Sequence, residues 1–169
     1  MEQKYVDSLD ILYENTIRQN ENILENFRAL DTKGSIFLAF LGIFIIPEIE
    51  NLIYAIENQQ SNYLTIIFSV CSVLYNIVGI LFCFIALKLR NINLPPKLEN
   101  LKRHYENGID SVEMKEQLLS TFLLASKENE QQVFLKTNNL IFVYWMSVFT
   151  LVGYISSKIT LIFINGSIL

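Results

Sequence analysis

Three apolar runs dominate the pattern of hydrophobic and polar positions along this chain. They are Ile36–Ile46, Tyr63–Leu87 and Asn139–Ile164. The second run carries no formally charged residue, and a helix needs roughly 20 apolar residues to cross a hydrocarbon core about 30 Å thick. The period-2 alternation of a membrane β-barrel strand is absent. The pattern therefore predicts an all-α chain with three transmembrane helices.

The first apolar run is short and is followed by Pro47. Proline lacks an N–H group and clashes with the preceding turn, so we expect a bend or an end there. Either the span starts near Ala29 and ends around Pro47, or it continues to Ile56 with a kink. We expect Glu48 and Glu50 to face water beyond the membrane, because unpaired carboxylates in lipid are costly; lining an aqueous cavity in an oligomer is the alternative.

The segments before and between these runs have amphipathic helical spacing. Apolar residues recur every three or four positions from Lys4 to Leu30, with Asn20 in the apolar seam, where a buried Asn can set register. No linker separates this helix from the first span, so we expect one continuous helix. Asp110 or Ser111 starts another helix, with Glu113 in its first turn, and nothing breaks it before Asn139.

Charge placement predicts the orientation. Basic residues precede the first run and lie between the second and third, whereas the tip between the first two runs has none. By the positive-inside rule, the N-terminus and residues 90–138 are cytoplasmic. We therefore expect an integral membrane protein with no cleavable signal and four parts. These are a cytoplasmic amphipathic helix (1–33), a transmembrane hairpin (34–89), a cytoplasmic helical segment that completes a small bundle (90–138), and a third transmembrane helix with a short outer tail (139–169).

Small and polar side chains in the predicted spans share faces. The second span has Ser69, Ser72, Asn76, Gly79 and Cys83 at a three-four spacing, the first has Ser35, Ala39 and Gly42, and the third has Ser147, Thr150, Gly153, Tyr154 and Ser157. Such faces allow helices to approach closely in lipid, and we favour packing over a pore lining. The residues that we select for packing or a pore are Ser72, Asn76, Gly79, Ser147 and Thr150.

Catalytic and metal-binding patterns are missing from the sequence. We find no nucleophile–base constellation, paired-carboxylate cleft or phosphate-binding loop. Cys71 and Cys83 fall on one helix about 18 Å apart, beyond disulfide reach. We therefore expect no enzyme activity, no metal, no resident cofactor and no nucleic acid polymer as partner.

Charged residues mark the predicted entry to the membrane at Arg28, Asp31 and Lys33. They are either anchors that reach the lipid headgroups, which we favour, or a charged ring that binds an anion or transmits motion into the bilayer. The stretch Arg28-Ala-Leu-Asp31-Thr-Lys33-Gly34 resembles the membrane effectors of Pycsar, a bacterial anti-phage system in which a cyclase makes cyclic CMP or cyclic UMP. In that family Ala is usual where this chain has Gly34. The stretch from Ala125-Ser-Lys127 to Lys136-Thr-Asn138 is also similar to the family.

The resemblance implies an oligomeric effector that binds a cyclic pyrimidine nucleotide from a partner cyclase and impairs the inner membrane, causing abortive infection. Basic residues would hold the phosphate, and the candidates for ligand binding or coupling are Arg28, Asp31, Lys33, Lys102 and Arg103. The alternatives are a non-enzymatic membrane scaffold or accessory subunit, or a membrane effector of another nucleotide-triggered defence system.

Overall fold

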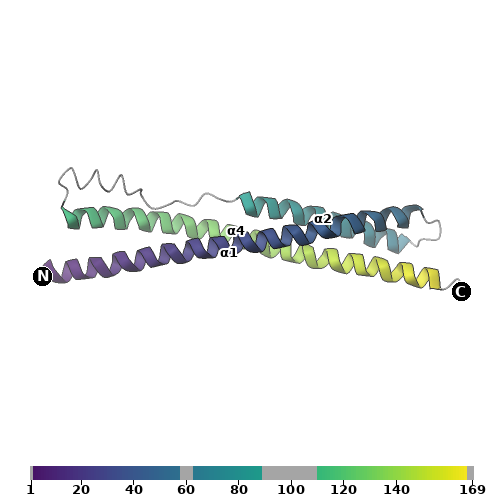
Figure 1. Cartoon of the computed structure of the whole chain (residues 1–169), viewed down its shortest axis with the longest axis horizontal. Coiled ribbons are helices and arrows are strands. Elements are labelled where there is room, and N and C mark those ends of the chain that lie inside the picture. The colour runs from purple at the N-terminus through teal and green to yellow at the C-terminus, as the bar shows by residue number, and fades with distance from the viewer. Residues whose placement is uncertain (1, 58–62, 89–109, 167–169) are drawn as a thin grey trace. The chain divides into compact units, whose positions relative to one another are not determined.

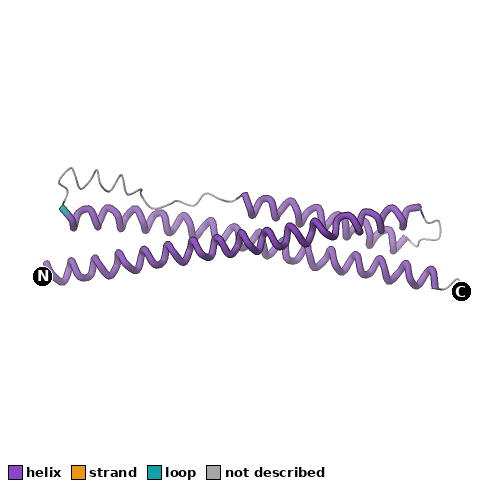
Figure 2. The backbone as a smooth tube through the Cα atoms, in the orientation of Figure 1, coloured by secondary structure: helices purple, strands orange, loops and turns teal. Residues whose placement is uncertain are grey.

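Long helices account for nearly all of the described chain. The computed structural model describes residues 2–57, 63–88 and 110–166, and the helices are α1 (Glu2–Glu57), α2 (Tyr63–Lys88) and α4 (Ser111–Gly166) (Figures 1 and 2). Each contains a stretch long and apolar enough to cross a membrane. The all-α prediction and the three candidate spans are confirmed.

The two continuous helices predicted from sequence are present. α1 and α4 are both 56 residues long and contain no break. The start of α4 is fixed locally, because Asp110 Oδ1 accepts a hydrogen bond from Ser111 N at 2.7 Å and Asp110 O accepts one from Met114 N at 3.0 Å. Asp110 is thus the N-cap, which satisfies N–H groups that the first helical turn leaves unpaired.

The chain divides into two units. Unit 1 comprises Met1–Ala29 with Arg90–Leu135, and unit 2 comprises Leu30–Leu89 with Lys136–Leu169. α1 and α4 contribute residues to both units, whereas all of α2 belongs to unit 2.

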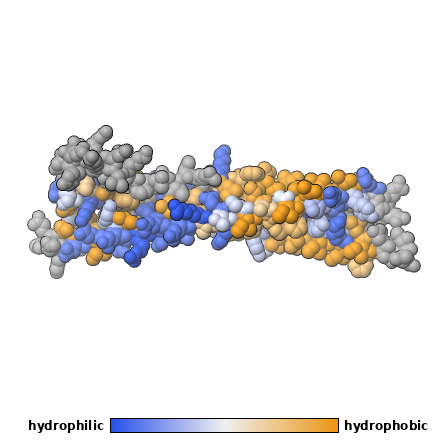
Figure 3. Space-filling model, viewed as in Figure 1, coloured by the Kyte–Doolittle hydropathy of each residue, from blue (hydrophilic) through white to orange (hydrophobic). Residues whose placement is uncertain are grey.

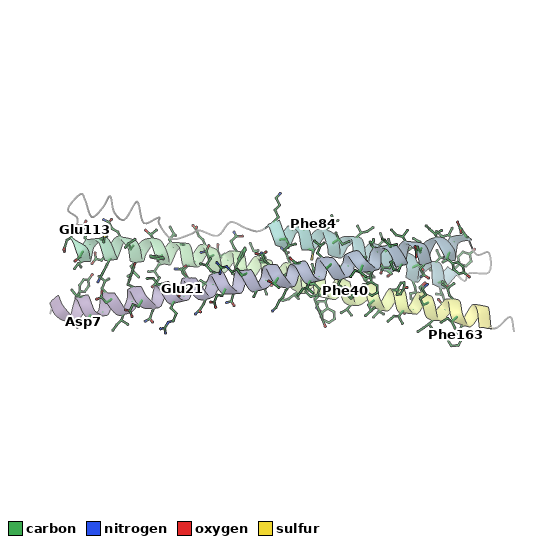
Figure 4. All side chains as sticks on the ribbon, viewed as in Figure 1. Asp7, Glu21, Phe40, Phe84, Glu113 and Phe163 are labelled. Carbon is green, nitrogen blue, oxygen red and sulfur yellow. The ribbon has the colours of Figure 1, made fainter. Side chains whose placement is uncertain are left out.

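Unit 1 packs α1 against α4 through a seam with polar members. Leu9, Ile23 and Phe27 of α1 are buried, as the apolar spacing predicts. Asn20 is also buried, and its Nδ2 donates to Phe122 O of α4 at 3.4 Å and to Thr16 O at 3.2 Å. The side of unit 1 visible in Figure 3 is mostly hydrophilic, and Glu21, labelled in Figure 4, is one of its exposed residues.

In unit 2, α2 turns small and polar side chains inward and large apolar side chains outward. Every buried residue of α2 is small or polar, at a regular three-four spacing: Thr65, Ser69, Ser72, Asn76, Gly79, Cys83 and Ala86. Large apolar side chains lie outside instead, and Phe84 and Phe163, labelled in Figure 4, are 56% and 75% exposed. The visible face of unit 2 is accordingly mostly hydrophobic (Figure 3).

The helices of unit 2 approach closely where glycine faces a neighbour. A Cβ atom added at Gly153 of α4 would lie 3.1 Å from Ser72 Cβ and 3.3 Å from Ser72 Cα on α2. One added at Gly79 of α2 would lie 3.0 Å from Leu41 Cδ1. Close backbone approach at small residues supplies the van der Waals contact that holds helices together in lipid.

Two expectations about α1 are corrected. The expectation that Glu48 faces water is wrong, because Glu48 is only 1% exposed. Of the two alternatives for the end of the first span, continuation is the one observed, since α1 runs to Glu57. Just after the proline, Glu48 is hydrogen-bonded to Ser72 and Asn76 of α2. The predicted packing face of Ser35, Ala39 and Gly42 is exposed instead, and a Cβ at Gly42 would meet no atom within 4 Å.

Candidate functional site

The candidate site is a set of hydrogen-bonded polar side chains in the interior of unit 2. α1 presents Gly34, Leu41, Glu48 and Ala55 to this interior at intervals of one heptad. A heptad interval keeps residues on one stripe of a helix packed in a bundle. The register that buries Gly34 and Leu41 therefore also buries Glu48.

Glu48 joins all three helices. Its Oε1 lies 2.6 Å from Ser72 Oγ of α2, and Ser72 Oγ lies 2.9 Å from the backbone carbonyl oxygen of Thr150 on α4. Its Oε2 accepts a hydrogen bond from Asn76 Nδ2 at 2.8 Å, and the same nitrogen donates to Leu41 O of α1 at 3.1 Å. A single carboxyl group thus links α1 to α2 directly and to α4 through one hydroxyl.

A second polar cluster follows toward the C-terminal end of α1. Asn51 Nδ2 donates to Ser157 Oγ at 2.7 Å and to Ser69 Oγ at 3.1 Å, and the two hydroxyl oxygens are 2.6 Å apart. Thr65 Oγ1 of α2 donates to Thr160 Oγ1 of α4 at 3.0 Å. Each helix therefore contributes polar groups to both clusters.

A buried ion pair lies where α1 and α4 enter unit 2. Lys136 Nζ donates to Asp31 Oδ1 at 2.5 Å, and the Lys136 side chain is 0% exposed while that of Asp31 is 34% exposed. Removing an ammonium group from water is expensive unless a carboxylate compensates it. Asp31 is therefore engaged within the protein.

The structure describes three of the five residues predicted for ligand binding or coupling, and one of these three, Asp31, pairs with Lys136. Arg28 is exposed in unit 1, Lys33 is exposed in unit 2, and Lys102 and Arg103 lie outside the described residues. The residues predicted for packing or a pore are all inside unit 2: Ser72, Asn76, Gly79, Ser147 and Thr150. Ser147 Oγ donates to Val143 O at 2.9 Å within its own helix.

Comparison of the chain with protein-family models, curated proteins and solved structures gives no match.

Sequence reasoning missed five side chains of these networks, namely Glu48, Asn51, Thr65, Lys136 and Thr160. Thr65 and Thr160 extend the spacing of Ser69 and Ser157 by four and three positions, and a usable signal was present for the other three as well. The heptad stripe through Gly34 and Leu41 reaches Glu48, and Asn51 lies three positions further. Extending the three-four spacing of the third span backward from Val143 and Leu140 reaches Lys136. Because a buried charge is costly in lipid, the sequence favoured a position facing water for Glu48 over one on this stripe.

Asn76 provides a direct test of this network. Asn76→Ala removes the donor to Glu48 Oε2 and to Leu41 O, so we expect the free energy of unfolding to fall by about 1–2 kcal/mol, the range of interhelical hydrogen bonds in membranes. The measurement is unfolding in mixed micelles of rising dodecyl sulfate content. Exposed Asn138 is the matched control, and Asn138→Ala should change the free energy by less than about 0.5 kcal/mol. Equal effects at both positions would contradict the network.

Proposed function

We propose that the chain is a bacterial inner-membrane effector in which unit 2 lies in the bilayer and unit 1 receives a signal in the cytoplasm. The exterior of unit 2 supports the membrane placement. Ile43 is 72% exposed, Ile36 63% and Leu81 56%, a surface that suits lipid and would promote aggregation in water. The excess of Lys and Arg before the first span and between the second and third supports a cytoplasmic unit 1.

Helix continuity is the observation that carries the proposal. α1 and α4 each pass from unit 1 into unit 2 as unbroken helices. A ligand that binds unit 1 more tightly in one packing of α1 against α4 would favour that packing, and both helices would extend the change into the bilayer. The membrane would lose integrity when several copies repack in this way.

The resemblance to Pycsar effectors supports a cyclic pyrimidine nucleotide as the signal. Unit 1 has an open cavity of about 480 Å³ that offers suitable chemistry on α4. It is lined by Lys127, Glu130, Gln131, Phe134 and Leu135. Lys127 would pair with the phosphate and Gln131 with the base edge, while the ring of Phe134, which is 64% exposed, would stack on the pyrimidine. The carboxylate of Glu130 accepts a hydrogen bond from Gln19 Nε2 at 2.7 Å, so this acidic group already has a partner within unit 1.

Co-expression with a pyrimidine cyclase tests the function. We expect loss of membrane potential, followed with a voltage-sensitive dye, only when an active cyclase is present. Depolarisation that also occurs with an inactive cyclase would reject signal gating. The absence of depolarisation under both conditions would favour a scaffold or accessory subunit.

Lys127→Ala should reduce cyclase-dependent depolarisation at least tenfold, because a charge-assisted hydrogen bond contributes about 1.5–3 kcal/mol. Lys33→Ala tests the residue predicted from sequence in the same assay. Lys158→Ala is the control, since its ammonium group lies 5.6 Å from the centre of the Tyr154 ring in unit 2. Insertion is checked by membrane fractionation of each variant. Full depolarisation by Lys127→Ala would exclude this cavity as the nucleotide site.

A further inference from the structure

Among the described residues, Glu48 has no cationic partner. It is 1% exposed, and its hydrogen-bond partners are Ser72 and Asn76, which are neutral. Among the described residues of α2, the first basic side chain is Lys88 at the last turn. On α4, Lys136 pairs with Asp31, and Lys158 is exposed beside the Tyr154 ring.

The other titratable groups described near this part of the bundle are acids, phenols and thiols, none of which can carry a positive charge. Glu50 on α1 is exposed. Tyr154 on α4 packs edge-on against Phe44, Tyr75 on α2 packs against Phe149, and Cys83 on α2 donates to Gly34 O. Cys71 on α2 is half-buried. An ionised Glu48 would therefore be a buried charge without a counter-charge among the described residues, which is strongly unfavourable in a bundle with an apolar exterior.

The number of available protons decides the state of the carboxyl group. Asn76 Nδ2 has two hydrogens, and its two contacts, Leu41 O and Glu48 Oε2, use both. Ser72 Oγ has one hydrogen but lies 2.6 Å from Glu48 Oε1 and 2.9 Å from Thr150 O. A backbone carbonyl oxygen can only accept. One hydroxyl hydrogen cannot point directly at both oxygens, so two well-aligned hydrogen bonds here need a second proton, which Glu48 can supply.

We infer that Glu48 is a proton-binding site and is a neutral carboxylic acid when unit 2 is packed. Its Oε1–H then donates to Ser72 Oγ, Ser72 donates to Thr150 O, and Oε2 accepts from Asn76. Each of these short contacts has one hydrogen, and no net charge is buried.

Three buried polar atoms around this site have no hydrogen-bond partner within the part of the chain that the structure describes. They are Asn51 Oδ1, Asn76 Oδ1 and Thr150 Oγ1, one on each helix of unit 2. When the helices separate, water can enter and form hydrogen bonds with these atoms. Water would then accept the proton of Glu48 and hydrate the carboxylate, so unit 2 releases a proton when it opens and low pH favours the packed form. This inference does not rest on a nucleotide signal.

Infrared spectroscopy of the full chain in lipid, without nucleotide, tests the protonation state. At neutral pH we expect a carbonyl stretch of a protonated carboxylic acid that is absent from Glu48→Gln and retained in Glu50→Gln, the matched exposed control. The band should be unchanged when sodium replaces choline at constant pH. A band that disappears with sodium would assign a metal cation to Glu48, and a neutral-pH spectrum without the band would overturn the inference.

The pH dependence of stability is the second measurement. Glu48→Gln retains a carbonyl acceptor and supplies N–H donors in place of the acid's O–H, so its thermal midpoint in detergent should match wild type at low pH. As pH rises, the wild-type midpoint should fall because the packed form binds the proton more tightly than the unfolded form, whereas that of Glu48→Gln should fall less. Parallel profiles for the two proteins would overturn the inference, whether or not the chain responds to a cyclase.

Discussion

Asp31→Ala is expected to lower the free energy of unfolding by about 3–5 kcal/mol, the largest effect of any single substitution considered. The change removes the carboxylate that lies 2.5 Å from Lys136 Nζ, and the Lys136 side chain is 0% exposed. An ammonium group at that depth is separated from water and depends on compensating charge. The measurement is thermal denaturation in a mild detergent, followed by far-ultraviolet circular dichroism.

The chain contains a matched control for this substitution. Asp10 and Lys115 form an ion pair with the same 2.5 Å separation, but their side chains are 46% and 36% exposed. Asp10→Ala should therefore cost only about 0–1 kcal/mol. Adding Lys136→Met to Asp31→Ala should restore most of the lost stability, because an apolar side chain then replaces the buried charge. A double variant no more stable than Asp31→Ala would show that Asp31 does not act through Lys136.

Gly153→Leu should separate α2 from α4. A Cβ at Gly153 would already lie 3.1 Å from Ser72 Cβ, 3.3 Å from Ser72 Cα and 3.4 Å from Phe68 O. Two of these neighbours are backbone atoms, which cannot move aside as a flexible side chain can. We expect a loss at or above the upper end of the roughly 1–3 kcal/mol typical of overpacking, with a smaller loss for Gly153→Ala.

Gly42→Leu is the control, because a Cβ at Gly42 would meet no atom within 4 Å. Replacing this helical glycine should be neutral or stabilising by about 0.5–1 kcal/mol. Unfolding in mixed micelles can be followed by the fluorescence of Trp145, the single tryptophan of the chain. A stable Gly153→Leu protein would contradict the close approach of α2 and α4.

Local sequence signals were sufficient for the helices and for the interior face of α2. The uncharged run from Tyr63 to Leu87 specifies a helix because an apolar backbone must satisfy its own hydrogen bonds. The spacing of Ser69, Ser72 and Asn76 gave the correct face because small and polar residues gather where helices meet. Asp110 marked the start of α4 by capping chemistry, which depends only on neighbouring residues.

Local signals failed where a distant partner changed the free energy of a position. At Pro47, which costs a helix about 3 kcal/mol, the sequence left open whether the helix ends or continues, and α1 continues to Glu57, with Glu48 hydrogen-bonded to α2 and Asn51 hydrogen-bonded to α2 and α4. The Ser35, Ala39 and Gly42 face had the right composition for packing but points away from both neighbours. Small residues identify a helix face that can pack closely against a neighbour. Which face of α1 actually contacts α2 and α4 depends on how the helix is rotated in the bundle.

The sequence by itself determined that this chain forms long helices, that three segments are apolar enough to cross a membrane, and which residues of the second segment face inward. Those features depend on apolar runs and on the spacing of small and polar residues within a single helix. Only the tertiary structure decided that Glu48 is interior and that Asp31 meets Lys136, because a polar or ionisable side chain is stable at depth only when groups far along the chain reach it.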